Sequence, residues 1–588
     1  MGYIKKILCQ RRGSFTVQNI KMDNTYKNRT LQKLDKISVI TGYKNTVDMM
    51  LKFIIPFQAT SIIIAILIFF FVDILPKYTG AIIFFTGITF SILYPLTKFN
   101  ASKTEINNHL HYFITYAGTI STMKISRGML FRKISEQKAF GEIGQIFEKI
   151  LYLAKSWNVG YANSCRIMVK RTSSHILGDF LDRLAVIMDF GQDLETFLYD
   201  EQEAVLDDYE VEYTKSLETI KMLQELFISI TISFAFLIGI ALLAPLLLEV
   251  GIDTVLIIAT GAVFMLDFSL ALSINSLIPS DKLVKVHKIK NNKQKKIFYS
   301  FIIGLVTATI LISSMLLFTN LQLISALAFG ILPLLYCGIV ANKEDEDITK
   351  RDKQFPTYVR VLGSAIEVRN GGVISALRST QVHSFGPLND MSINLYRRLR
   401  LGSEKFKSWH YFAVETGSNI ISNFSKIFSE SIYLGGNAQK IGEIVSKNVL
   451  RLVSMRKLRQ QVAGGLRGAF YGSMIGLTAT IYVCARISQV LVEIFTVPSG
   501  NEDLSAFVDT IIPQIAPVNF ELVSMYIALI ILIQSASSAW IMKAIDGGNQ
   551  YSALVDFIIM MWIGAILSWI LPGVIDSLLP DFGDVWAE

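Results

Sequence analysis

The chain has 588 residues, 52% of them hydrophobic, and a mean hydropathy of +0.44. A purely soluble chain rarely reaches such values, so the composition predicts a membrane protein. The formal net charge is +8, and we attribute most of it to membrane topology. No basic stripe interleaved with aromatic residues is found, so nucleic acid is not expected as a partner.

The N-terminal segment, residues 1–52, is polar and carries eleven Lys and Arg residues. It is far longer than the charged head of a secretory signal, so we expect no signal peptide. Nine apolar segments then follow that are each long enough to cross a bilayer, and lipid requires them to be helices. They are residues 54–75, 79–97, 226–248, 254–278, 297–318, 321–341, 469–494, 522–542 and 553–575.

Basic residues predict the orientation, because Lys and Arg favour the cytoplasmic side. The loop from Lys282 to Lys296 carries seven lysines, whereas the loops on the opposite side hold Lys77 as their one basic residue. We therefore expect the N-terminus inside and the C-terminus outside. An even number of spans separates the two long polar stretches, so both should be cytoplasmic.

Seven regions follow from these boundaries. Residues 1–52 form a basic cytosolic segment and 53–98 hold spans 1–2. Residues 99–225 form the first cytosolic helical module, 226–341 hold spans 3–6 and 342–466 form the second module. Residues 467–576 hold spans 7–9, and 577–588 form an extracytoplasmic tail. The expected fold is an all-α, polytopic membrane protein with about nine transmembrane helices and two repeated modules.

The two modules are copies of one pattern. "FITYAGTISTMKISRGMLFRKIS" from Phe113 matches "FPTYVRVLGSAIEVRNGGVISALRS" from Phe355, and later landmarks keep an offset of 242 to 245 residues. Phe180 matches Phe424 in an amphipathic helix. The matched glycines Gly191 and Gly435 stand where a helix C-cap is expected.

After each capping glycine, a proline-free helix runs toward the next span. It is "YEVEYTKSLETIKMLQELF" in the first module and "IGEIVSKNVLRLVSMRKLRQQVAGGLRGAF" in the second. A continuous helix would be stiff and could carry force or rotation between module and bilayer. The alternative, that these helices only connect the two parts, stays open.

Catalytic and cofactor signatures are absent from the sequence. It contains no phosphate-binding loop, no H-E-x-x-H and no acidic calcium loop. The four cysteines are scattered, and His109 and His111 would lie on different helix faces. We expect no enzyme activity, cofactor or metal.

Two features lie within the spans. Asp267 and Arg486 are intramembrane charges, which are costly and often functional. They could form a structural pair, Arg486 could snorkel outward, or they could belong to an ion or proton pathway. A ridge of Gly464, Gly468, Gly472 and Gly476 would let another backbone approach closely. It could join the two halves of this chain or form a homodimer contact, and we expect it to pack inside the chain.

The modules also differ in charge. The first ends in the acidic run "DEQEAVLDDYEVE", whereas the second is rich in Arg and Lys. Opposite charges suit the steering and registration of a large partner. Solvated faces, or attraction between the two modules, explain the same pattern.

The hairpin from Phe113 through Gly128 to Ile134, and that from Phe355 through Gly371 to Leu377, resemble the F domain of type II secretion systems. Two copies with about nine spans are most similar to archaeal members, the assembly platforms of archaella and type IV pili. The resemblance implies a platform without catalysis. Its implied partners are a hexameric secretion ATPase, pilin- or archaellin-like subunits, the lipid bilayer and a second copy in a homodimer. ATPase-facing positions would be Arg127, Glu142, Arg397, Arg398, Arg400, Arg456 and Lys457.

Internal repeats and intramembrane charges also occur in secondary transporters, so a transporter with two internal repeats is the alternative. Transporter repeats rarely contain a cytosolic bundle of this length in each half. The sequence also lacks a clear pair of broken helices at mid-membrane. Both points favour the platform.

Overall fold

The computed structural model describes residues 46–50, 54–56, 58, 102–123, 126–243, 252–279, 281–285, 292–318, 322–369, 372–496 and 520–578. Over these ranges the regular structure is helical, with an isolated β-bridge between Val284 and Ser418. The all-α prediction is therefore confirmed. The predicted spans 54–75 and 79–97 lie almost wholly outside the described residues. The chain divides into two compact units.

The first unit comprises residues 1–107 and 144–191. Its helices are α3 (Thr46–Met49), most of α7 (Glu142–Ser156), α8 (Tyr161–Val169) and α9 (His175–Phe190). The Ser174 side chain caps α9 by accepting a hydrogen bond from the Leu177 amide. Gly191 ends α9 in the left-handed conformation with φ of 68°, as its sequence position predicted.

The second unit comprises residues 108–143 and 192–588, and it contains the long apolar helices. Among the described residues of this unit, six helices have the length and composition to cross a membrane, and a bent pair provides a seventh candidate. The six are α10 (Leu194–Leu243), α11 (Ile252–Leu277), α12 (Asn292–Phe318), α19 (Ala438–Thr496), α21 (Phe520–Asp546) and α22 (Ala553–Leu578). Each coincides with a predicted span. The chain is thus a multi-pass membrane protein.

The bent pair corresponds to the predicted span 321–341. It consists of α13 (Leu323–Gly330) and α14 (Leu334–Val368), whose axes differ by 47°. Pro333 separates the two helices, since proline cannot donate the next backbone hydrogen bond. Residue 341 was predicted as the end of the span, and α14 continues beyond it as one helix into the second module.

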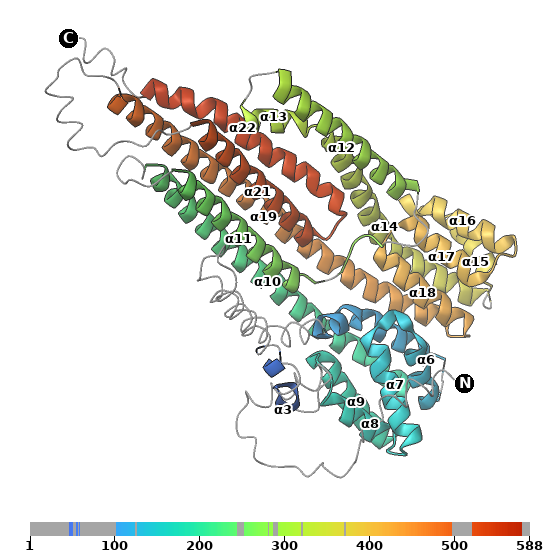
Figure 1. The fold of residues 1–588 in the computed structure, drawn as a ribbon. Coiled ribbons are helices and arrows are strands. Elements are labelled where there is room, and N and C mark those ends of the chain that lie inside the picture. The colour runs from blue at the N-terminus through green and yellow to red at the C-terminus, as the bar shows by residue number, and fades with distance from the viewer. Residues whose placement is uncertain are drawn as a thin grey trace, which may run out of the picture. The chain divides into compact units, whose positions relative to one another are not determined.

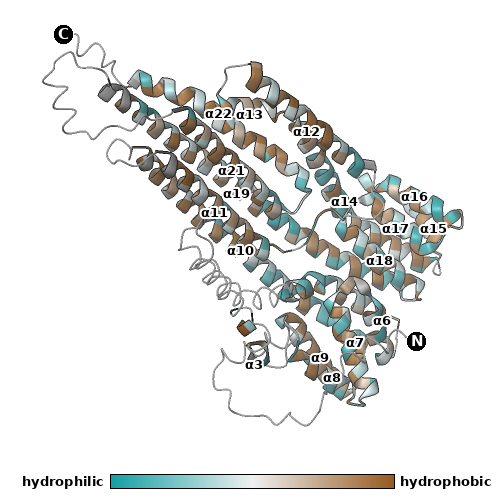
Figure 2. Ribbon diagram, in the orientation of Figure 1, coloured by the Kyte–Doolittle hydropathy of each residue, from teal (hydrophilic) through white to brown (hydrophobic). Residues whose placement is uncertain are grey.

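Helix α19 is central to this unit. It packs against α10, α14, α21 and α22, while α11 packs on α10 and α21, and α12 on α13 and α14. Apolar residues predominate in α11, α12, α21 and α22, whereas hydrophilic residues are more frequent in α14 and in α15–α18 (Figures 1 and 2). We call the end that holds α15–α18 the polar end.

The polar end of the second unit contains short helices of both modules. From the first come residues 108–121, α6 (Arg127–Glu136) and η3 (Lys138–Phe140). From the second come α15 (Val373–Thr380), η5 (Gly386–Leu388), α16 (Asn389–Arg400), α17 (Lys405–Thr416) and α18 (Asn419–Tyr433), which follow α14.

Both modules contain the same elements in the same order. Each runs helix, short helix, 3-10 turn and three helices, and then enters a helix that continues as a span. The caps are repeated too, since Ser418 caps α18 through the Ile421 amide as Ser174 caps α9. Gly435 has φ of 91° just after α18, as predicted. This agreement supports the repeat recognised in the sequence.

Candidate functional site: the junction of modules and spans

Three helices of the second unit run without interruption from apolar to polar surroundings. They are α10, α14 and α19, with 50, 35 and 59 residues. The continuity predicted for α10 and α19 is confirmed. We use the term junction for the middle of these helices together with loop 279–285 and turn 547–552. Any movement passed between the polar end and the apolar helices must cross the junction.

Acidic residues of α10 face basic residues of α19 along the junction. Lys440 pairs with Glu195 at 3.0 Å, Lys447 pairs with Glu203 at 3.4 Å, and Arg451 pairs with Glu210 at 2.9 Å and also with Asp207. Glu203, Asp207 and Glu210 belong to the acidic run that the sequence analysis singled out, and their partners lie in the module described there as rich in Arg and Lys. Attraction between the repeats therefore accounts for this part of the charge pattern.

These pairs join equivalent positions of the two repeats. Their sequence separations are 245, 244, 244 and 241 residues, close to the repeat offset. The same spacing continues toward the apolar part, where Ser488 donates to the Leu242 carbonyl across 246 residues at 3.0 Å. Two copies of one helix thus lie side by side in register, as they would about an internal two-fold axis.

Next to these ion pairs, α10 and α19 are also joined by a buried network of amide side chains. The Asn448 amide nitrogen donates to Gln202 at 2.9 Å and to the Thr115 hydroxyl at 2.8 Å. Gln202 and Asn448 are again matched positions of the repeats. Buried polar groups need such partners, so this network specifies the register more strictly than exposed ion pairs do.

Arg456 of α19 lies at the centre of the junction. It donates to both carboxylate oxygens of Asp281, at 2.5 and 2.6 Å, and to Asp352 of α14 at 2.7 Å. Burial alone would raise the pKa of Asp281, but the charge and hydrogen bonds of Arg456 outweigh burial and hold it below its usual value. One guanidinium therefore joins α19, α14 and the loop between α11 and α12.

Arg459, one turn further along α19, binds backbone carbonyls. It donates to Ala544 at 2.9 Å, to Ile545, to Pro279 at 3.1 Å and to Asp281 at 3.0 Å. Its guanidinium approaches so closely that a Cβ at position 547 would lie 2.8 Å from it, and that residue is glycine with φ of 81°. Arg459 thereby satisfies carbonyls at the ends of α11 and α21.

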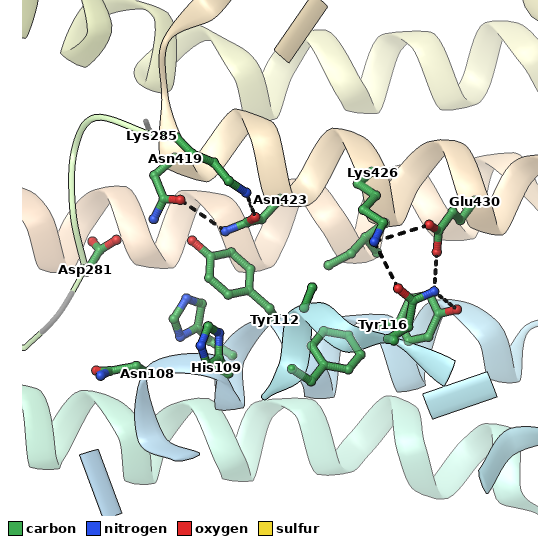
Figure 3. A pocket seen from close by; sticks show the side chains of 15 residues that line it. Asn108, His109, Tyr112, Tyr116, Asp281, Lys285, Asn419, Asn423, Lys426 and Glu430 are labelled. Atoms are coloured by element: carbon green, nitrogen blue, oxygen red, sulfur yellow. Dashed lines mark hydrogen bonds and ion pairs between the residues drawn. The ribbon is translucent and has the colours of Figure 1, made fainter. Parts of the chain in front are cut away.

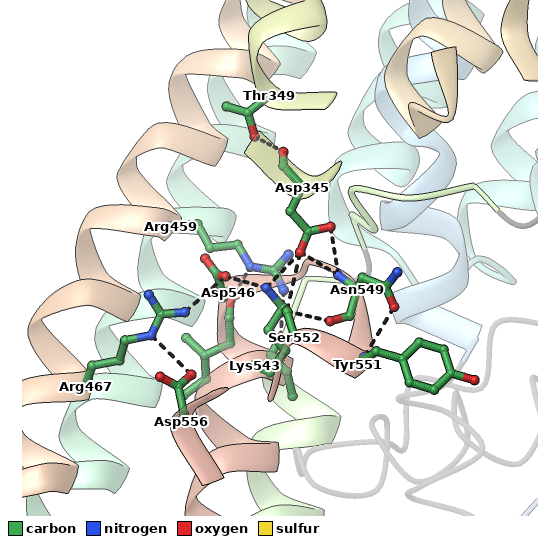
Figure 4. Close-up of polar contacts among 12 residues, drawn as sticks. Asp345, Thr349, Arg459, Arg467, Lys543, Asp546, Asn549, Tyr551, Ser552 and Asp556 are labelled. Carbon is green, nitrogen blue, oxygen red and sulfur yellow. Dashed lines mark hydrogen bonds and ion pairs between the residues drawn. The ribbon is translucent and has the colours of Figure 1, made fainter. Parts of the chain in front are cut away.

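A second buried cluster connects α14 to the α21–α22 turn (Figure 4). Lys543 donates to Asp345 and to Asp546, both at 2.9 Å, and its side chain is 4% exposed. Asp345 also accepts a hydrogen bond from the backbone N–H of Asn549 at 2.9 Å. Arg467 of α19 reaches Asp546 at 3.4 Å. The charges compensate one another, as buried charges must.

A cavity of about 260 Å³ opens beside the junction (Figure 3). One wall is the helix 108–121 with Gln137 and Phe140, and the other is one face of α18; Asp281 and Lys285 close one side. His111 lines the cavity and is 2% exposed. Burial lowers the pKa of His111 to about 3, so its imidazole is neutral at physiological pH.

The residues expected to face an ATPase separate into groups. Arg397, Arg400 and Lys457 are exposed. Arg398 is held by Glu415 and lies 5.3 Å from the centre of the Tyr411 ring. Arg127 and Glu142 are half-buried. Arg456 is only 8% exposed and bonded within the junction, which is incompatible with the surface role expected of it.

Asp267 and Arg486 do not pair with each other, so that alternative of the sequence analysis is not what the structure shows. Arg486 pairs with Asp576 of α22 at 2.7 Å and donates to Gln489 at 3.0 Å. Asp267 accepts from Ser537 of α21 at 2.5 Å. With its amide nitrogen turned toward the carboxylate, Gln534 also donates to it at 3.2 and 3.3 Å. Each charge thus binds α21 or α22 rather than the other charge.

The glycine ridge of α19 does not pack as expected within the described part of the chain. A Cβ placed at Gly464, Gly468, Gly472 or Gly476 would meet no described atom within 4 Å. Close helix contact occurs elsewhere, where a Cβ at Gly363 of α14 would lie 2.6 Å from the Ala438 carbonyl and 3.0 Å from Gly442. Those two glycines stand alone in the sequence, so no periodic pattern marked them.

Sequence reasoning also missed the buried acids Asp281, Asp345 and Asp352 and the buried Lys543. Lys543 follows an apolar span and Asp281 begins a lysine-rich loop, so both look like ordinary interfacial charges. One sequence signal was available. The polar part of α14 begins with the acidic run "KEDED", and acids that become buried require a cation nearby. A search over the described residues gives no group of His, Cys, Asp and Glu arranged to hold a metal ion.

The fold defines a class, a multi-pass helical membrane protein with a duplicated module whose last helices become spans. The family described as type II secretion system (T2SS), protein F, matches residues 113–242. The chain is 31% identical over 543 residues to flagella accessory protein J of Methanocaldococcus jannaschii, covering 90% of this chain and 96% of the relative. The protein of that name from Methanococcus voltae is 28% identical over 542 residues, with the same coverage. No solved structure matches the chain. The chain belongs to the flagella accessory protein J family.

Proposed function

We propose that this protein is the membrane platform of an archaeal filament machine, an archaellum or a related type IV pilus. The observation that carries the proposal is the likeness to flagella accessory protein J over nearly the whole of both chains. The family names also associate the first module with secretion-system machinery. The platform itself performs no catalysis.

In this proposal the polar end faces the cytoplasm and receives a secretion ATPase. The basic residues beside the apolar helices support that orientation. Arg397 and Arg400 on α16, together with Lys457 on α19, offer exposed positive charge to such a partner. Arg127, Glu142 and Arg398 are secondary candidates.

The junction supports a mechanical role. Helices α10, α14 and α19 are continuous, and Arg456 joins two of them to the loop between α11 and α12. Motion imposed on the polar end would therefore reach several apolar helices together. Filament subunits would receive that motion within the membrane or beyond it.

The docking proposal is tested with the full chain in nanodiscs and a secretion ATPase from the same organism. Reversing two exposed charges, Arg397→Glu with Arg400→Glu, should weaken binding about tenfold or more, because attraction becomes repulsion. Binding to the unchanged chain should also weaken as salt rises. Biolayer interferometry measures both effects.

The matched control reverses two exposed lysines of α14, Lys350→Glu with Lys353→Glu, in the same module. It should bind within about twofold of the unchanged chain, because long-range repulsion alone is screened at physiological salt. Equal losses in both variants would show a general charge effect rather than a docking surface on α16. Absence of ATPase binding to the unchanged chain would contradict the proposal itself.

A further inference from the structure

The cavity beside the junction is a formed site with an unusual charge distribution. The backbone of Lys285 is held in place, because loop 281–285 is hydrogen-bonded to the start of α18. Lys285 donates its backbone N–H to the Gly417 carbonyl at 3.1 Å, and Asn419 donates to the Leu283 carbonyl at 3.0 Å. The Lys285 side chain reaches Asn423, a neutral amide (Figure 3).

Lys285 has no carboxylate within ion-pair distance among the residues that the structure describes. Burial, followed by the charge of the nearby Lys426, lowers the pKa of Lys285 to about 8. Lys426 lies 3.0 Å from the Gln137 amide oxygen and 3.6 Å from Glu430. Two lysines therefore face one cavity whose lining also includes two carboxylates, Asp281 and Glu430.

The cavity acids already have other partners. Asp281 is held through both oxygens by Arg456, and Glu430 accepts from Gln137 at 2.7 Å as well as pairing with Lys426. Neither is positioned to neutralise Lys285. A partly buried cation without a counterion is costly, and a bound anion would remove that cost.

A second observation also indicates a ligand. Both ring nitrogens of His111 lack a hydrogen-bond partner within the described structure, although its side chain is almost fully buried. Buried polar atoms normally have partners, and those that lack them call for an explanation. Asn419 and Asn423 add amide groups on the same face of α18.

We propose that this cavity binds a phosphate group, carried by a small soluble ion or by the headgroup of a lipid. Lysine is a common phosphate ligand, and a phosphate presents several acceptor oxygens to the N–H donors of Lys285, Lys426 and His111. The volume of about 260 Å³ lies near the lower limit of small-molecule sites. The bound group would contact both repeats and loop 281–285, and would thus stabilise their contact with one another beside Arg456.

The test uses the full chain, purified in neutral detergent. Inorganic phosphate should raise the unfolding temperature relative to chloride at equal ionic strength, because a ligand of the folded state stabilises it. Lys285→Met should weaken phosphate binding about tenfold or more, the usual cost of losing a charge-assisted hydrogen bond. Lys282→Met is the matched control, since this exposed lysine of the same loop is not part of the cavity.

A second arm separates the two sources of phosphate. The chain is exposed to vesicles containing phosphatidic acid or the phosphate-free diacylglycerol, and bound lipid is counted by native mass spectrometry. Retention of phosphatidic acid that depends on Lys285 identifies a headgroup. Stabilisation by phosphate without lipid retention identifies a soluble ion. Failure of both probes to bind, or equal binding to the Lys285→Met and Lys282→Met variants, overturns the proposal.

Discussion

Individual charged residues in this protein differ sharply in what they contribute, and burial decides the difference. Lys440 and Lys447 are exposed and pair across α10 and α19, so each pair contributes little. Lys543 makes contacts of similar length, yet its side chain is almost entirely removed from water. Removing one partner there leaves the others uncompensated.

Lys543→Met is therefore expected to destabilise the protein by about 3–5 kcal/mol, because buried Asp345 would lose its cation and Asp546 would keep only its longer contact with Arg467. Adding Asp345→Asn should recover part of that loss. Lys440→Met serves as the control and should cost about 1 kcal/mol or less. Unfolding by denaturant in mixed micelles measures all three. Similar losses for Lys543→Met and Lys440→Met would contradict this account.

His111 gives the protein a specific sensitivity to acid. Its pKa is lowered to about 3 in the folded state, whereas an unfolded histidine titrates near 6.5. Between these values the unfolded state binds more protons, so His111 reduces stability as pH falls below 6.5. At pH 4 the loss should be on the order of 3 kcal/mol.

His111→Phe should flatten the pH dependence of the unfolding temperature between pH 6.5 and 4, since phenylalanine does not titrate. His175→Gln provides the comparison, because His175 is exposed, with 86% of its side chain accessible. That variant should keep the pH profile of the unchanged chain. A profile that His111→Phe leaves intact would assign the acid sensitivity to other groups.

Among single residues, the sequence predicted those whose role is local. Gly191 and Gly435 end helices, and a glycine after an amphipathic run is a local signal. The roles of Arg456 and Asp267 depend on neighbours far away in the chain. Asp281 lies 175 residues from Arg456, and Ser537 lies 270 from Asp267. No local pattern specifies such partners, so Arg456 was assigned to the surface, and the partner of Asp267 was left open.

At the scale of elements, hydrophobic length identified every apolar helix that the structure describes, but it did not place all their ends. Helix α14 includes the end of the predicted span at residue 341 and continues to Val368. The residues after 341 are polar, so hydropathy falls at that point although the helix continues. The break before α14 was also missed, since Pro333 stands inside an apolar run.

The pairing of α10 with α19 is the element-scale feature that permits a direct test. Arg451→Glu places a carboxylate beside Asp207 and Glu210, and repulsion should cost about 1–2 kcal/mol. Adding Asp207→Arg restores opposite charges at the same two positions and should recover most of the loss. A double-mutant cycle on the full chain measures the coupling energy.

The cycle distinguishes a registered pair from a general charge effect. Lys457→Glu makes the same change of charge on an exposed position of α19 and should show no coupling to Asp207→Arg. Coupling of similar size in both cycles would mean that overall charge, and not the matched register of the two repeats, governs the response.

At the scale of the whole molecule, the sequence supplied the repeat, the order of modules and spans, and the family. The transporter alternative receives little support, because Asp267 and Arg486 each have a structural partner on α21 or α22. The contacts of equivalent positions could not be foreseen from the repeat alone. A repeat establishes that two segments are similar, whereas only coordinates show that Gln202 meets Asn448.

The side-by-side copies of one helix have a consequence for how such a protein can work. Two identical chains meeting in this way would present the same surface after half a turn. Here one copy is acidic where the other is basic, so half a turn exchanges unlike faces. Joining both copies in one polypeptide lets them diverge while keeping their mutual fit. The interface between α10 and α19 therefore distinguishes its two sides by charge, which the interface of a symmetric pair of chains could not do.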